Sequence, residues 1–225
     1  TRERGYLCSY NAADVSLPPQ LDEPVDAARD LPRTLLTGKV RAFLRALPVL
    51  DLKTFCAEAS EAQLRTAMVR YSFMVQAYVW GEPDAPKSLP PSMAVPIWAL
   101  AKRLGQQPLL PYSSYVLDNW DRLDREGPIA LDNIYMIQNF LAGQDEAWFV
   151  LVHVAIEARA GSMLAEIPAL MAAANNGDAK AVEAGLAAEQ GHVFPGGNAG
   201  KVQPNAELAG PDLFQRLVLV AADDQ

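Results

Sequence analysis

The sequence predicts a protein that is mostly or wholly α-helical. In several separate segments the apolar residues repeat every three to four positions, which is the spacing of one helix face. Strong alternation of apolar and polar residues, the pattern of a half-buried strand, is not found. Half of the 225 residues are apolar, which is enough for a sizeable core.

The N-terminal part is expected to hold an extended stretch and then two helical blocks. Residues 1–32 are rich in Pro and Asp, and we expect them to wrap over the surface. In the second block, residues 50–80, a helix is expected to begin at Ser60, because Gln63 completes a capping box. The expected apolar faces of the two blocks are Leu36, Val40, Phe43, Leu44 and Leu47, and then Leu64, Met68, Tyr71, Val75 and Tyr78.

The remaining elements follow from breakers and periodicity. A short helix over residues 92–105 is expected to stop at Gly105, and residues 106–120 to form an extended stretch with a helical turn near Trp120. Residues 130–143 predict a short helix or a paired segment. The longest periodic element spans residues 145–177, with a kink or a new start at Pro168 and a face made of Phe149, Val152, His153 and Ile156. Another short helix, residues 178–190, precedes loop-like sequence from Gly191 onward.

Composition and charge narrow the classes of partner. The formal net charge is −8 and no run of basic residues occurs, so no nucleic-acid partner is expected. The longest apolar run, residues 147–156, is far shorter than the ~20 residues of a membrane span, so no membrane partner is expected either. Two cysteines, Cys8 and Cys56, show no metal-ligand spacing, and no signal peptide is recognised. A reduced, cytoplasmic setting is the expectation.

Catalytic signatures of hydrolases, nucleotide-binding proteins and zinc proteases are missing from the sequence. Two readings of His153 stay open. It can be a core histidine held by Glu157 one turn later, or a polar tip that projects into an apolar pocket and forms one hydrogen bond with a ligand. His192 is expected in an exposed loop without a role. Three of the four tryptophans fall between Met74 and Trp120, which suits either a planar ligand or a plain core.

Three segments resemble the indoleamine 2,3-dioxygenase family. "YVWGEPDAPKSLPPSMAVPIWALAKRLGQQPLLPYSSYVLDNW", residues 78–120, is similar to a signature of the family's small domain. "WFVLVHVAIEARAGSMLAEIP", residues 148–168, is similar to the first helix of its large domain, and "LPRTLLTGKVRAFLRALPVLD" to an earlier helix. Together they extend over roughly residues 28–175.

The resemblance implies an all-α haem protein, with haem b and its iron as cofactor. Such a protein inserts both atoms of O₂ across the C2–C3 bond of the indole of L-tryptophan, or of a related indoleamine, to give N-formylkynurenine. The implied organisation is a small N-terminal domain over residues 1–140, the first helices of the large haem domain over residues 141–190, and a loop-rich tail over residues 191–225. The oligomeric state and the axial ligand of the iron stay open.

The resemblance also implies a set of site residues. His153 matches a position that is serine in many members and histidine in the related tryptophan dioxygenases, where it bonds the indole N–H, so we expect it to be distal and ligand-facing rather than the iron ligand. The "FPGGNAG" segment resembles a family loop that touches the amino-acid part of the substrate. The expected substrate-binding residues are Tyr112, Tyr115, Val116, Phe149, Val150, His153, Gly197, Asn198 and Ala199.

The sequence departs from the family pattern in ways that keep alternatives open. Tyr115 stands where cysteine is common and Val150 where the family has phenylalanine, so substrate preference is open. The family's proximal histidine and its carboxylate-binding arginine have no recognisable counterpart, which fits either missing segments or a truncated relative. The alternatives to a dioxygenase are a haem-free, non-catalytic module that binds a small molecule, and a haem enzyme that acts on another aromatic amino acid.

Overall fold

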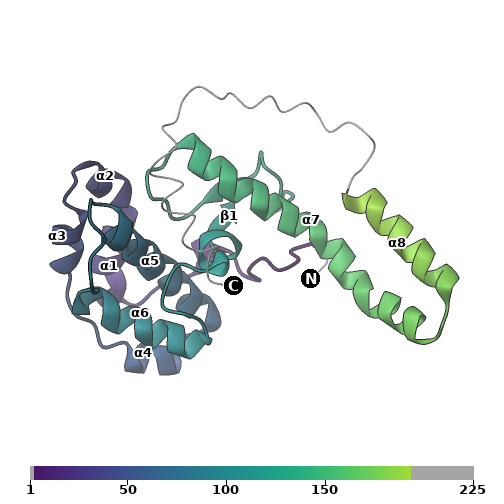
Figure 1. The fold of residues 1–225 in the computed structure, drawn as a ribbon, viewed down its shortest axis with the longest axis horizontal. Helices are drawn as coiled ribbons and strands as arrows, with labels where there is room; N and C mark the ends of the chain where they lie inside the picture. The colour runs from purple at the N-terminus through teal and green to yellow at the C-terminus, as the bar shows by residue number, and fades with distance from the viewer. Residues whose placement is uncertain (1–2, 194–225) are drawn as a thin grey trace.

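In a computed structural model, residues 3–193 can be described, with side chains through residue 187. The mostly α-helical class is confirmed (Figure 1). The α-helices are α1 (Asp22–Arg29), α2 (Leu31–Leu36), α3 (Val40–Arg45), α4 (Lys53–Glu58), α5 (Glu61–Trp80), α6 (Pro91–Leu104), α7 (Gln144–Asn175) and α8 (Ala179–Val193). Short turns at η1 (Ala12–Asp14), η2 (Pro19–Leu21) and the π-helical η3 (Ser113–Leu117), and the strands β1 (Trp120–Arg122) and β2 (Ile134–Met136), complete the described part.

Helix α5 is the centre of the packed body formed by α1 to α6. Its start is the predicted one, because the Ser60 side chain accepts a hydrogen bond from the Gln63 backbone N–H and the Gln63 side chain accepts from the Ser60 N–H. All five residues of the predicted apolar face are buried. The opposite face is buried as well, at Phe73 and Met74, because α1, α3 and α6 surround the helix.

The prediction for the N-terminal stretch is wrong, and the stripe after it is interrupted. Residues 22–29 form α1, which has acidic residues in its first turn and Arg29 in its last. The expected continuous helical stripe is two short helices, because the chain turns at Gly38, whose φ of 65° suits glycine. Leu36 and Phe43 are consequently exposed, at 81% and 38%, whereas Val40 and Leu44 are fully buried.

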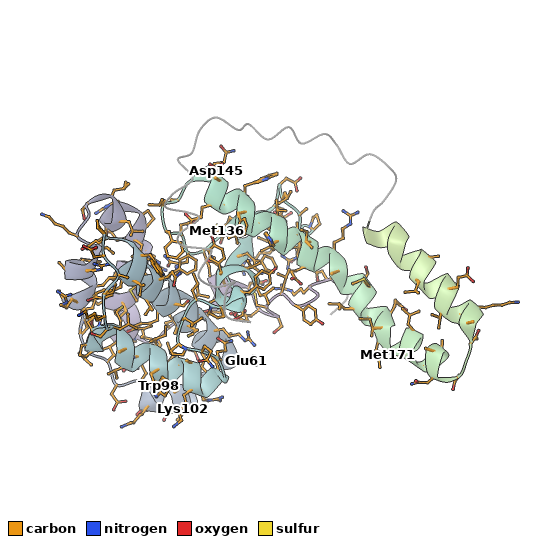
Figure 2. The ribbon with its side chains drawn as sticks, in the orientation of Figure 1. Glu61, Trp98, Lys102, Met136, Asp145 and Met171 are labelled. Atoms are coloured by element: carbon orange, nitrogen blue, oxygen red, sulfur yellow. The ribbon has the colours of Figure 1, made fainter. Side chains whose placement is uncertain are left out.

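Helix α6 agrees with its prediction. It starts after Pro90, and Gly105 ends it in the left-handed conformation with φ of 67°. Met93, Ile97 and Leu100 are buried on the side that packs on α5, and Trp98 points outward with 63% of its surface exposed (Figure 2). The tryptophans that are concentrated in this part of the sequence therefore do not form one ligand-binding surface.

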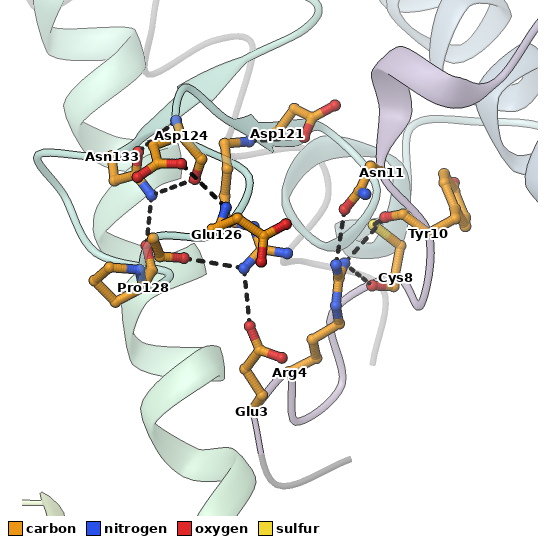
Figure 3. A network of polar contacts seen from close by, with 12 residues as sticks. Glu3, Arg4, Cys8, Tyr10, Asn11, Asp121, Asp124, Glu126, Pro128 and Asn133 are labelled. Carbon is orange, nitrogen blue, oxygen red and sulfur yellow. Dashed lines mark hydrogen bonds and ion pairs between the residues drawn. The ribbon is translucent and has the colours of Figure 1, made fainter.

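The predicted paired segment after Trp120 is strand β2, which pairs antiparallel with β1 in the register Trp120 to Met136. Arg4 holds the N-terminal segment in a folded-back shape and contacts Trp120 of β1 (Figure 3). The Arg4 guanidinium donates to the carbonyl oxygens of Cys8 and Tyr10 and to Asn11, at 2.8–3.0 Å, and lies over the Trp120 ring at 5.5 Å. Both cysteines are buried and free.

Helix α7 leaves the packed body and continues into the hairpin that it forms with α8 (Figure 1). It runs through Pro168 as one helix of 32 residues, so no new helix starts there. The predicted loop character at Gly191 is also wrong, because α8 extends through His192 to Val193. By length and composition alone α7 could cross a membrane, and within the described residues only 17% of its most apolar window is buried.

Candidate functional site

The residues that the resemblance singles out come from two elements that pack on each other. Tyr112 lies just before η3, and Tyr115 and Val116 lie in it; Phe149, Val150 and His153 lie in the first turns of α7. Because η3 packs against both α5 and α7, residues that are more than 30 positions apart in the sequence share one face. The π-helical turn places Tyr115 between the two helices, where its ring lies 5.7 Å from Phe73 and 6.1 Å from Phe149.

The exposed side of this junction is an aromatic face that ends at His153. The rings of Phe149 and His153 are 4.6 Å apart, and the edge of Tyr112 meets His153 at 6.3 Å. Such tilted and edge-to-face arrangements are the favourable ones for aromatic pairs. Tyr112 is 47% exposed, so the face is open on this side within the described residues. We call Tyr112, Tyr115, Phe149 and His153 the aromatic face.

One hydrogen bond decides which nitrogen of His153 is available. Its Nδ1 lies 2.6 Å from the carbonyl oxygen of Phe149, one turn earlier in α7. A carbonyl oxygen can only accept, so Nδ1 carries a proton and donates it to this bond. In the neutral ring Nε2 is then an unprotonated acceptor, and the half-buried ring offers it to a ligand that carries an N–H or O–H group.

The pairing of His153 with Glu157, one of the two readings of the sequence, is not what the structure contains. The Glu157 carboxylate accepts a hydrogen bond from the hydroxyl of Tyr112, at 3.0 Å. Burial, together with the hydrogen bond and the charge of Glu157, raises the pKa of Tyr112 to about 12. Glu157 thus fixes the tyrosine at the rim of the aromatic face, a role that the sequence did not indicate.

Val116 and Val150 lie behind the aromatic face. Both have no exposed surface and pack in a second core cluster with Trp120, Ile134 and Val154. Of the face of α7 that the sequence indicated, Phe149 packs against this cluster in part. The buried side of α7 is formed by Glu146, Val150, Val154 and Gly161. Ile156 is 58% exposed.

Glu146 is a second residue of the junction that the sequence did not single out. Its carboxylate accepts hydrogen bonds from the backbone N–H groups of Phe140, Leu141 and Ala142, at 2.6–3.1 Å. Burial raises the pKa of Glu146, and these three donors lower it in part. Burial, with a smaller contribution from the charge of Glu146, raises the pKa of Tyr115, whose buried hydroxyl has no hydrogen-bond partner in the described part.

Metal ligands are not gathered at this junction. Among residues 3–187, no group of three or more His, Cys, Asp and Glu side chains is placed to hold a metal ion. The predicted contact residues Gly197, Asn198 and Ala199 lie outside the described residues.

Known proteins are similar in sequence to most of this chain. A family model described as indoleamine 2,3-dioxygenase matches residues 2–193. The chain belongs to the indoleamine 2,3-dioxygenase family. The resemblance read from the sequence is thereby confirmed, and with it the assignment to a family of dioxygenases.

Individual relatives support the family and define how much of it is present. The chain is 32% identical over 180 residues to indoleamine 2,3-dioxygenase 1 of Rattus norvegicus, a match that includes 76% of this chain and 44% of the relative. It is 36% identical over 156 residues to indoleamine 2,3-dioxygenase of Saccharomyces cerevisiae, with 66% of this chain and 34% of the relative covered. The chain thus spans less than half the length of these members of the indoleamine 2,3-dioxygenase family.

Proposed function

We propose that the aromatic face is the substrate side of a haem-dependent dioxygenase that inserts O₂ across the C2–C3 bond of the indole of L-tryptophan, or of a related indoleamine, to give N-formylkynurenine. Family membership supports the reaction class. The observation that carries the assignment to this face is the acceptor nitrogen of His153, fixed beside the rings of Phe149 and Tyr112. L-tryptophan and O₂ are the partners in this proposal.

In the proposed complex each residue of the face has a physical task. The Nε2 atom of His153 accepts the indole N–H, which orients the ring in its plane. Phe149 and Tyr115 provide apolar ring surface against the indole, and Val116 and Val150 back them from the core. The hydrogen bond from Tyr112 to Glu157 fixes the Tyr112 side chain at the edge of the aromatic face. None of these tasks requires His153 to ligate iron.

The described residues fit the distal side of a haem pocket, because they form an apolar, aromatic face that contains one acceptor nitrogen. A bound haem b would supply the activation of O₂. Phe149 and Tyr115 are the residues that we expect against its distal side, and no described residue is assigned as the axial ligand. We also propose the division into a small domain, residues 1–140, and the first helices of a haem domain, residues 141–190.

The test compares ligands that differ in one hydrogen-bond donor. The full 225-residue chain is titrated with hemin while the Soret band is followed, and then with L-tryptophan and its benzothiophene analogue, in which sulfur replaces the indole N–H. One neutral hydrogen bond is worth about 1 kcal/mol, so we expect the wild type to bind tryptophan roughly fivefold more tightly. His153→Ala and His153→Ser should lose this discrimination, and Ile156→Ala, an exposed position one turn away, should keep it.

The outcomes separate the candidate functions. Unchanged tryptophan affinity and turnover in His153→Ala would remove His153 from the site. Discrimination of the two ligands without any Soret change would favour a haem-free binding module. A Soret shift with turnover of a different aromatic amino acid, and no turnover of tryptophan, would indicate a haem enzyme that acts on that other amino acid.

A further inference from the structure

A cavity that shares no residue with the proposed substrate face lies against α5. It has a volume of about 600 Å³ and forms where the N-terminal segment, α1, α5 and β2 meet. That volume is in the range of small-molecule sites. Met136, labelled in Figure 2, lines it from the strand, together with the apolar side chains of Val15, Leu17, Val25 and Ile137.

Arg70 of α5 lines this cavity, and its guanidinium is a buried cation. It is only 7% exposed, yet both of its hydrogen bonds go to neutral acceptors. Nη1 donates to the carbonyl oxygen of Ile137 at 2.7 Å and to Oε1 of Gln138 at 2.6 Å. Within the described residues Nε is buried without a partner, Nη2 makes no hydrogen bond, and no carboxylate forms an ion pair with the guanidinium.

A buried cation without an anion is costly, because burial removes its hydration and neutral acceptors replace only part of the lost interaction. Burial, and then repulsion from Arg29, lowers the pKa of Arg70 to about 10. Arg29 lines the same cavity, so two guanidinium groups act on its interior. Within the described residues, Arg70 therefore lacks a carboxylate partner that would offset the cost of its burial.

We propose that this cavity binds a small monocarboxylate that carries a short apolar group, with its carboxylate at Arg70 and Arg29. The apolar side chains contact the hydrocarbon part. Asp22 and Asp26 also line the cavity and disfavour ligands of higher negative charge, so a monoanion fits better than phosphate. Arg29 forms an exposed ion pair with Asp26 at 3.5 Å, which keeps its guanidinium at the rim. This site is independent of the proposed function and uses none of its residues.

The experiment uses calorimetric titration of the full chain with valerate, valeramide and inorganic phosphate, together with NMR of the arginine Nε–Hε groups. We expect saturable binding of valerate that shifts the Arg70 signal, and at least about tenfold weaker binding of the uncharged valeramide, since charge-assisted hydrogen bonds are the strong ones. Phosphate should bind more weakly than valerate.

Variants at the rim test the charges without disturbing the buried arginine. Arg29→Gln should weaken valerate binding by roughly three- to tenfold, as expected for one partly exposed charge. The matched control is Arg33→Gln, because Arg33 forms the same kind of exposed i,i+3 pair, with Asp30, outside this cavity. Asp22→Asn should strengthen valerate binding, a gain that loss of folding cannot imitate.

Any one of five results would overturn the proposal. Equal affinity for valerate and valeramide would remove the role of the charge. Equal effects of Arg29→Gln and Arg33→Gln, or weaker binding in Asp22→Asn, would remove the cavity as the place of binding. Tighter binding of phosphate than of valerate would refute the monocarboxylate as ligand. The absence of any shift of the Arg70 signal would show that its guanidinium only connects α5 to the segment after β2 and does not contact the ligand.

Discussion

Helices α5 and α7 are both long and rich in apolar residues, but they are used in opposite ways. α5 has 20 residues, and neighbouring helices bury most of them. α7 has 32 residues, of which Glu146, Val150, Val154 and Gly161 are the buried ones. In Figure 2 side chains crowd around the packed body, whereas the end of α7 marked by Met171 lies away from it, beside α8.

The difference shows that apolar composition does not by itself report burial. A helix that is apolar on all sides is normally surrounded, either by protein or by lipid. α5 meets this rule with residues of the described chain, and α7 does not. The chain spans less than half of the relatives that it matches. The residues described here leave most of the apolar surface of α7 uncovered.

The strongest test of this comparison uses the same substitution in both helices. Met74→Ala in α5 removes a side chain with no exposed surface, so we expect the free energy of unfolding to fall by about 2–5 kcal/mol. Met171→Ala in α7 changes a residue that is 61% exposed, and we expect an effect within about 0.5 kcal/mol. Urea denaturation measures both. Equal losses would show that the exposed side of α7 is covered in solution, and the comparison would fail.

A second pair of variants tests the contact that α7 does make with the N-terminal segment. Gly5 has φ of 56°, and a Cβ there would meet the carbonyl oxygen of Glu157 and lie 3.3 Å from the N atom of Gly161. We expect Gly5→Ala to cost about 2–3 kcal/mol, from backbone strain and from the clash with α7. Gly38→Ala is the control, since φ is 65° and nothing lies near its Cβ, and it should cost about 1 kcal/mol. Equal costs would mean that the N-terminal segment does not pack on α7.

The sequence predicted the fold well wherever local chemistry determines structure. The capping box at Ser60 and the left-handed stop at Gly105 depend on neighbouring residues only, and both are confirmed. The buried side of α7 was not predicted, because Phe149 and Val150 are both apolar, and periodicity cannot tell which of two adjacent apolar stripes a neighbour covers. α1 was missed because its largest contact is with α5, which is distant in sequence.

The site shows the same limit more sharply. The resemblance named Tyr112, Tyr115, Phe149 and His153, and the structure brings these four together on one face. It did not indicate Glu157 as the partner of Tyr112, because the two are 45 positions apart and meet only when η3 packs on α7. Arg70 was invisible for a related reason. Nothing in a sequence distinguishes an arginine that is buried without an anion from one on the surface.

The smallest expected effects concern how the two helices begin. The Ser60 side chain caps α5, and Ser60→Ala should lower the free energy of unfolding by about 1 kcal/mol. The N-cap residue of α7 is Gly143, which has extended backbone angles and no side chain to cap the helix, and a Cβ there would meet nothing within 4 Å. Gly143→Ser should therefore raise stability by a few tenths of a kcal/mol, roughly the difference between glycine and serine at this position.

The two variants are expected to change the free energy of unfolding in opposite directions. Urea denaturation of both variants and of the wild type measures these changes. A serine at position 143 can supply the oxygen that α7 lacks, whereas Ser60→Ala removes the oxygen that α5 uses. If Gly143→Ser were destabilising, the start of α7 would already be fixed in a way that a new side chain disturbs. The three backbone N–H groups that donate to Glu146 would then explain how the start of the helix is fixed, since they lie directly before it.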